Sequence, residues 1–115
     1  MGMDLIPNNT SIESIHYNWT GWAILTRFLE KHDCSMNEFA GVNDGDRISK
    51  DTCKLVAKIL REHAQEIPNI SRQYISEEEA KGVKFTKEDR DDASIIKDFL
   101  EDATFWEKCN GCQQW

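Results

Sequence analysis

Cys109 and Cys112 form the short motif with the widest chemical reach in this chain of 115 residues. Two thiols at this spacing can share one metal ion or form a redox pair. A tetrahedral zinc site needs four cysteine or histidine ligands, so this pair requires two more. We take His32 and Cys34 as the loose second pair, and the other cysteine and histidines are Cys53, His16 and His63.

The same tail is also explained without a metal, as the end of a helix with buried thiols. Cys53 falls on the apolar face of a predicted helix, where a structural cysteine is expected. A thioredoxin-like redox role would need a βαβ context, which the sequence does not predict. We therefore expect no cofactor, and we keep a zinc-stabilised module with the ligands Cys109, Cys112, Cys34 and His32 as an alternative.

The segment 41–49 contains Asn43-Asp44-Gly45 and runs into a predicted helix. It does not fit a calcium loop, because with Gly45 at loop position 6, apolar residues occupy positions that need oxygen ligands. Two explanations stay open. The segment is a tight turn, or Asn43, Asp44, Lys50 and the helix N-terminus bind an anion such as phosphate. The second explanation suggests a small-ligand or nucleotide-binding sponge domain.

Three aromatic residues are candidates for a partner interface. Trp19 lies just before a predicted helix, Phe39 lies in a loop, and Trp115 ends the chain. Large aromatic side chains often anchor protein interfaces. The run Glu77-Glu78-Glu79 is a candidate for electrostatic steering of a basic partner.

No familiar catalytic motif links the histidines to a nucleophile and an orienting acid. We therefore assign no catalytic residue and favour a non-enzymatic protein. The net charge of −7 argues against nucleic acid and membrane surfaces as partners, and it suits a basic protein partner. Residues 1–15 carry no lysine or arginine and no long apolar run, so we expect no signal peptide and a cytoplasmic protein with reduced thiols.

The length predicts one domain, with residues 1–14 as an N-terminal arm or loop and residues 15–115 as a single globular helical domain. The expected fold is mostly α, a small bundle of three to four helices. A minor two-stranded ribbon could pair residues 15–17 with 83–85. A homodimer is compatible with the number of aromatic residues.

Apolar spacing and capping residues predict where the helices begin and end. The first helix begins near Thr20, and the second begins after Ser49 and closes at Pro68. A short helix begins at Ser76 and ends at Gly82. The last begins at Thr86, with Gly111 just beyond its end.

The chain resembles short bacterial and phage proteins without assigned activity. The resemblance rests on the tryptophan pair at 19 and 22, Asn43-Asp44-Gly45 before a serine-capped helix, and the terminal Cys-Asn-Gly-Cys segment with Trp115. It implies a compact cytoplasmic protein and carries over no functional residue. Our leading expectation is a small acidic binding protein that acts stoichiometrically on a protein partner, as inhibitor, immunity and phage counter-defence proteins do.

Overall fold

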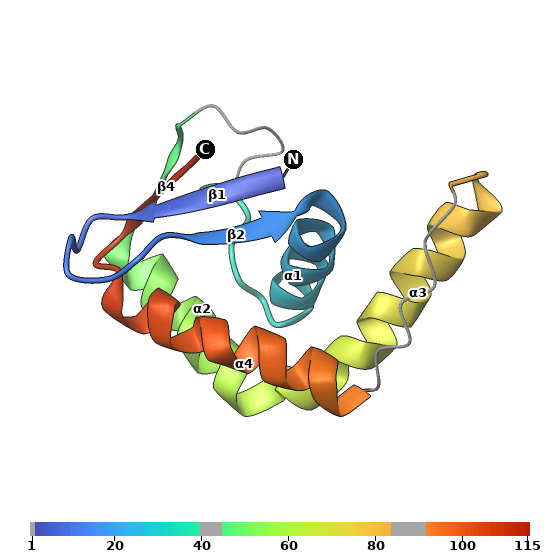
Figure 1. Cartoon of the computed structure of the whole chain (residues 1–115). Helices are drawn as coiled ribbons and strands as arrows, with labels where there is room; N and C mark the ends of the chain where they lie inside the picture. Colours follow the sequence, from blue (N-terminus) through green and yellow to red (C-terminus); the bar gives the residue numbers. More distant parts are fainter. Residues whose placement is uncertain (1, 40–44, 84–91) are drawn as a thin grey trace.

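The computed structural model describes residues 2–39, 45–83 and 92–115. These residues form a mixed α/β fold rather than a helical bundle with a minor ribbon (Figure 1). In chain order the elements are β1 (Gly2–Pro7), β2 (Ile15–Asn18), α1 (Trp19–Lys31), β3 (Arg47–Ile48), α2 (Lys50–His63), the 3₁₀ turn η1 (Ala64–Glu66), α3 (Ile67–Ala80), α4 (Asp92–Lys108) and β4 (Cys112–Gln114).

The sheet has four antiparallel strands in the order β2-β1-β4-β3. The prediction of an arm or loop over residues 1–14 is wrong for residues 2–7, because β1 lies inside the sheet between β2 and β4, whereas residues 8–14 are a loop. Met3 and Leu5 are fully buried, whereas Asp4 and Ile6 are exposed, which is the alternation of a strand with one face on the core. The chain ends meet there, and the Trp115 amide donates to the Asp4 carbonyl at 2.7 Å.

The strand predicted at residues 15–17 is confirmed, but its partner is β1. Val83 lies outside any strand, and residues 84 and 85 lie outside the described residues. The long-range pairing of β1 with β4 could not be predicted from the sequence. Both strands are short, and β4 begins only a few residues after the end of α4, at Cys112.

The helix starts were predicted with mixed success. Ser49 caps α2 as expected, since its hydroxyl oxygen accepts from the Thr52 amide at 3.3 Å. For α1 the cap is Asn18 rather than Thr20, and its side-chain oxygen accepts from the Gly21 amide at 2.6 Å. Asparagine and threonine are both good capping residues, and the tight approach of Gly21 to Asn18 favours the earlier position.

Pro68 opens α3 instead of closing the preceding segment. Proline is tolerated in the first helical turn because its missing amide has no helical partner there. The helix then runs unbroken through Ser76 to Ala80, so the separate short helix predicted at Ser76 is wrong. Thr86, the predicted start of the last helix, lies outside the described residues, and the described part of α4 begins at Asp92.

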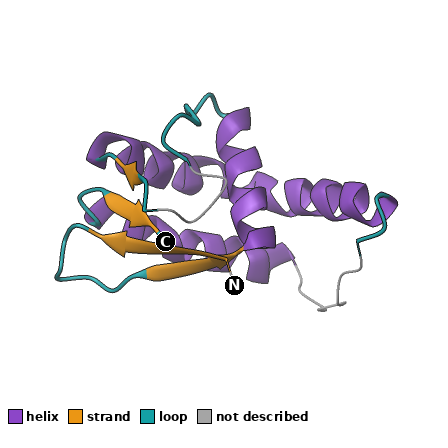
Figure 2. Ribbon diagram, turned by 90° about the horizontal axis from the view of Figure 1, so that it is seen from above, coloured by secondary structure: helices purple, strands orange, loops and turns teal. Residues whose placement is uncertain are grey.

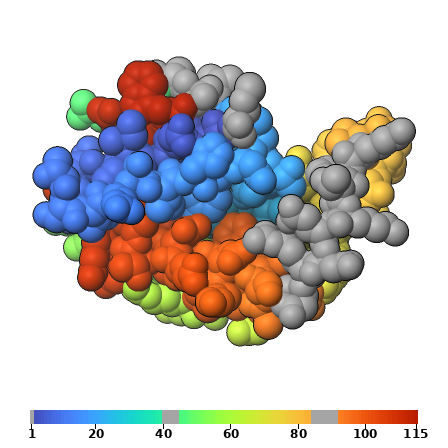
Figure 3. Space-filling model, viewed as in Figure 1, coloured from blue at the N-terminus to red at the C-terminus, as the bar shows by residue number. Residues whose placement is uncertain are grey.

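Helices α1, α2 and α4 lie on one side of the sheet, seen from above in Figure 2, and α2 and α4 pack along each other. Arg61 of α2 and Glu107 of α4 form an ion pair at 2.7 Å. The far end of α3 projects from the body, while in the space-filling view the N-terminal strands lie directly over α4 (Figure 3). In the described part of the chain, no helix combines the length and the apolar character needed to cross a membrane.

A single core joins the sheet to the helices. Its largest fully buried side chains are Trp106, Phe28, Met3, Leu5, Leu25, Leu29, Ile48, Leu60 and Ile67. Trp22 belongs to this core as well, as expected, and contacts the rings of Tyr17 and Phe39. The core therefore draws on the first strand as much as on the helices.

The position of β1 in the core can be tested with two neighbouring residues. Leu5→Ala should lower the free energy of unfolding by about 2–5 kcal/mol, because it leaves a cavity in the core. Ile6→Ala, on the exposed face, should change it by less than about 1 kcal/mol. Urea denaturation of the two variants and the parent measures both values, and equal effects would contradict the assignment of β1 as a core strand.

Candidate functional site

Three thiols meet where α4 ends and β4 begins. Cys109 follows the last residue of α4, Cys112 is the first residue of β4, and Cys53 lies in the first half of α2. All three side chains are fully buried. The sulfurs of Cys53 and Cys112 are 3.9 Å apart, and the three sulfurs lie within 4.8 Å of one another.

The predicted ligands Cys34 and His32 do not join this cluster. Cys34 follows α1, is buried, and its sulfur lies 3.9 Å from the carbonyl oxygen of Ser35. Cys53 joins the pair instead. The sequence offers it as a possible ligand but favours a structural role, because it falls on the apolar face of α2. A fourth cysteine, histidine, aspartate or glutamate ligand is not grouped with these three among the residues described.

His32 belongs to a different group, where the end of α1 meets the end of α2. Its ring stacks on that of His63 at 4.0 Å between centroids, and its Nε2 lies 3.2 Å from Glu66 Oε2. Lys31 contacts the other Glu66 oxygen at 2.7 Å, and this contact lowers the pKa of Glu66. The two stacked rings lie nearly parallel, and one ligand atom from each of His32, His63 and Glu66 lies within 4.8 Å of the others.

The thiols influence one another's ionisation. Hydrogen bonds from the Cys112 and Cys53 thiols lower the pKa of Cys109, because they stabilise its thiolate. The same contacts raise the pKa of Cys112 and Cys53, which act as donors in a buried setting. The cluster therefore accommodates one negative charge readily and resists further charge without a compensating cation.

The turn between the two cysteines is held by the loop that follows β1. The amides of Asn8 and Asn9 donate to the carbonyls of Gly111 and Cys109, each at 2.9 Å. Their side chains donate to the carbonyls of Asn110 and Lys108, at 3.0 and 2.9 Å. These bonds satisfy carbonyls that the end of α4 leaves without helical partners. The loop predicted as a free arm thus positions Cys109 and Cys112.

The predicted anion site at the start of α2 already holds a carboxylate. Glu38 accepts from the Ser49 amide at 2.7 Å and from the hydroxyls of Ser49 and Thr52. The hydrogen bond from Thr52 lowers the pKa of Glu38, as do those from Ser49. Lys50 is exposed at the first turn, and Asn43 and Asp44 lie outside the described residues. A phosphate at this helix end would meet the charge of Glu38, a residue that our sequence analysis missed.

Two of the aromatic candidates, Trp19 and Phe39, line one open groove. The groove has a volume of about 380 Å³, and its other lining residues are Trp22, Ala23, Thr26, Glu30 and Met36. Phe39 is half-buried and packs on Trp22 with 5.9 Å between ring centroids, whereas Trp19 is 37% exposed. The groove therefore combines two packed aromatic rings, those of Trp22 and Phe39, with the accessible indole of Trp19.

Trp115 stands apart from this groove. Its indole NH donates to the Gln113 side chain at 3.0 Å, and its ring lies so close to Gly45 that a Cβ there would be 2.7 Å from it. It is 48% exposed, yet its backbone pairs with Asp4. Trp115 therefore covers the edge of the sheet beside β3.

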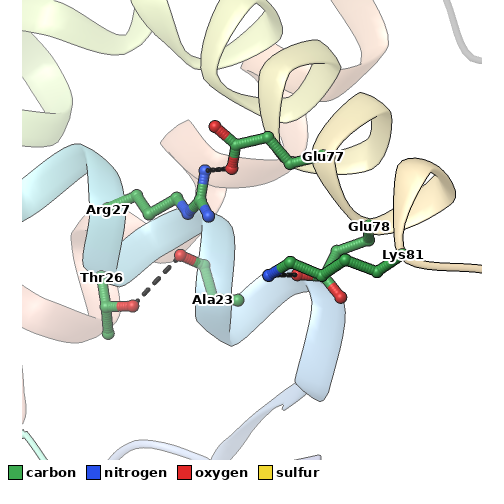
Figure 4. Close-up of polar contacts among 6 residues, drawn as sticks. All are labelled: Ala23, Thr26, Arg27, Glu77, Glu78 and Lys81. Atoms are coloured by element: carbon green, nitrogen blue, oxygen red, sulfur yellow. Dashed lines mark hydrogen bonds and ion pairs between the residues drawn. The ribbon is translucent and has the colours of Figure 1, made fainter. Parts of the chain in front are cut away.

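Two of the three consecutive glutamates are engaged in ion pairs. Glu77 of α3 contacts Arg27 of α1 at 2.6 Å, and Glu78 contacts Lys81 at 3.5 Å (Figure 4). Arg27 also lies over the ring of Tyr74 at 4.9 Å. Glu77 thus fastens α3 to α1, and Glu79 is exposed.

A buried polar chain crosses the core between β2 and α4. The Trp106 indole NH donates to the Tyr17 hydroxyl at 3.3 Å, and Tyr17 is hydrogen-bonded to Asp102. Burial raises the pKa of Asp102 to about 6, and the charges of Asp98 and Glu101 add to the effect. Burial also raises the pKa of Tyr17. Neither residue was singled out by the sequence analysis.

Comparison with known proteins gives no further guide, because no family model, curated protein or solved structure matches this chain. The function proposed for this protein therefore depends on the geometry of these residues.

The cysteine turn depends on Gly111, whose φ is +85°. An alanine Cβ there would lie 2.8 Å from the Asn8 side chain and 3.1 Å from the Ile48 carbonyl oxygen. Gly111→Ala should lower the free energy of unfolding by more than about 2 kcal/mol, from backbone strain plus this clash. Gly82 has a φ of +93° with nothing within 4 Å, so Gly82→Ala should cost about 1 kcal/mol from strain alone. Urea denaturation compares the two, and equal losses would refute the tight packing of the turn.

The raised pKa of Asp102 predicts a pH dependence of stability. Because the folded state holds the proton more tightly than the unfolded state, stability should be highest below pH 4 for this group and should fall as pH rises through about 6. Asp102→Asn should remove that slope and add about 1 kcal/mol of stability at pH 8, after allowance for partial solvent screening. Glu79→Gln, on the exposed end of α3, is the control and should leave the slope intact. Thermal unfolding from pH 4 to 8 tests this, and an unchanged slope in Asp102→Asn would contradict it.

Proposed function

We propose that this protein is a small non-enzymatic binding protein that acts stoichiometrically on a protein partner. The observation that carries the proposal is the convergence of Trp19, Trp22, Phe39 and Met36 in one open groove of about 380 Å³. A pocket of this kind suits an apolar side chain or short segment of a partner, and tryptophan is the residue type most often found at the energetic centre of an interface.

Charge adds a preference for the kind of partner. The chain carries a net charge of −7, and Glu30 lies at the groove itself. A partner segment with lysine or arginine would be attracted to this acidic surface. An apolar side chain of the same segment could then bind among the aromatic residues of the groove. Glu79 remains our candidate for long-range steering, because Glu77 and Glu78 have ion-pair partners within the chain.

The other parts of the proposal follow from the sequence. We place the protein in the cytoplasm and, in line with its charge, assign it no nucleic acid or membrane partner. Inhibitor, immunity and phage counter-defence proteins are the functional types that share its size and charge. A homodimer formed through the same groove would compete with the partner for Trp19.

The nucleotide-sponge alternative loses its best support. It needs the N-terminus of α2 to hold phosphate, and the Glu38 carboxylate occupies that position with hydrogen bonds from Ser49 and Thr52. The negative charge of Glu38 at the Ser49 amide makes this helix end unfavourable for an anion.

The groove proposal can be tested with two tryptophans. Immobilised parent protein, Trp19→Ala and Trp115→Ala are each exposed to a cell lysate, and the retained proteins are quantified. A specific partner should be retained by the parent and by Trp115→Ala. With the purified partner, Trp19→Ala should lower the affinity by at least about 2 kcal/mol, roughly thirtyfold, because it removes the indole at the edge of the groove.

Trp115→Ala is the matched control, since it removes an exposed indole that lies outside the groove. Circular dichroism and urea denaturation would show that both variants keep the fold. Retention of the same partner at equal affinity by Trp19→Ala, or no specifically retained protein at all, would overturn the proposal.

A further inference from the structure

The sulfurs of Cys53, Cys109 and Cys112 are arranged as metal ligands are. A tetrahedral zinc ion with Zn–S bonds of about 2.3 Å places its sulfur ligands about 3.8 Å apart. Cys53 and Cys112 are 3.9 Å apart, and all three sulfurs lie within 4.8 Å of one another. A metal could therefore contact all three after the more distant sulfurs approach by at most about 1 Å.

The three residues come from segments that are distant in sequence. Cys53 lies in α2, whereas Cys109 and Cys112 lie at the corner between α4 and β4. Each is fully buried, so the cluster is shielded from solvent oxidants and from exchange with bulk ligands. Cys34, the fourth cysteine of the chain, is also buried but stands apart, which shows that the clustering is not a property of every buried thiol here.

We propose that Cys53, Cys109 and Cys112 together bind one thiophilic metal ion, which ties α2 to the corner between α4 and β4. Thiolate ligands select zinc and copper(I) among the common metal ions. Copper(I) is satisfied by three thiolates, while zinc takes one further ligand beyond the three. Binding replaces the thiol protons, and these are released to solvent.

The bound ion acts structurally. The corner is held without metal by Asn8 and Asn9 on one side, and the metal adds a direct link from Cys109 and Cys112 to Cys53 of α2. Because ions that bind only the folded state stabilise it, a hundredfold excess of free metal over its dissociation constant should raise Tm by roughly 10 °C.

Cobalt(II) provides the direct probe, since it replaces zinc and reports sulfur ligation by intense sulfur-to-cobalt charge-transfer absorption. Reduced, metal-free full-length protein is titrated with cobalt(II) and then with zinc. We expect charge-transfer bands that saturate at one cobalt per chain and disappear when zinc displaces it. Metal should also slow the reaction of the three clustered cysteines with a thiol-specific reagent, measured at a urea concentration at which the metal-free protein exposes its thiols.

Variants assign the ligands. Cys53→Ser and Cys112→Ser should each weaken metal binding by at least about tenfold and lower the intensity of the sulfur-to-cobalt bands by roughly a third, because one of the three thiolate ligands is lost. Cys34→Ser is the matched control, a buried cysteine outside the cluster, and should leave the titration unchanged. His63→Gln should also leave the bands unchanged, which separates the thiol site from any metal held by the group of His32, His63 and Glu66.

A cysteine variant that fails to fold does not affect the test. The cobalt absorption and the number of thiols that metal protects are both measured on the unsubstituted protein. Sulfur bands at one equivalent with three shielded thiols support the proposal. If cobalt and zinc give no bands or protection, the same thiol protection is measured with copper(I). Protection of the three clustered thiols by copper(I) supports the site, and no protection by any of these ions overturns it.

Discussion

The antiparallel pairing of β1 with β4 is the interaction on which the rest of the structure depends. A strand inside a sheet needs partners for its backbone groups on both edges. For β1 these partners are β2 on one side and the last residues of the chain on the other. The pairing closes the chain end to end, and it forces α4 to finish beside the first loop and within reach of α2.

The cysteine corner is a consequence of that closure. Once β4 is fixed against β1, the chain must turn from α4 into the sheet within a few residues. Asn110 and Gly111 make this turn with positive φ values of 58° and 85°. Asn8 and Asn9 satisfy the carbonyls exposed at the helix end, so the turn is supported by four hydrogen bonds from a neighbouring loop. Cys109 and Cys112 are therefore held on rigid backbone, facing Cys53.

The formal net charge of the chain overstates the negative charge that is available to attract a binding partner. Several carboxylates serve the fold: Glu38 accepts from the Ser49 amide at the start of α2, Glu66 contacts Lys31, and Glu77 pairs with Arg27, which lies over Tyr74. Each of these is an internal electrostatic contact, so it contributes less to an outside partner than a formal charge suggests. The aromatic groove is different, because Trp19 keeps exposed surface while Trp22 and Phe39 are tied into the core.

Local signals in the sequence determined a good part of the helices. Ser49 predicted the start of α2, the apolar stripe predicted the inward face of α1, and residues 15–17 predicted a strand. These succeed because capping and amphipathic spacing depend on neighbours within four residues. Pro68 misled for the same reason, since a proline marks a helix start as well as a helix end and only the following residues show which.

Tertiary structure alone decided the sheet and the thiol cluster. The Cys109 and Cys112 pair was recognisable by its spacing, but its third member had to be chosen among Cys34, Cys53 and three histidines. Cys53 joins the pair because α2 packs along α4, which brings the first turns of α2 next to the C-terminal end of α4. In the same way, residues 2–7 looked like part of a free arm. One of the two partner strands of β1 is β4, which lies more than a hundred residues away in the sequence. Contacts at such separation follow from chain closure and core packing, which the residues next to them do not encode.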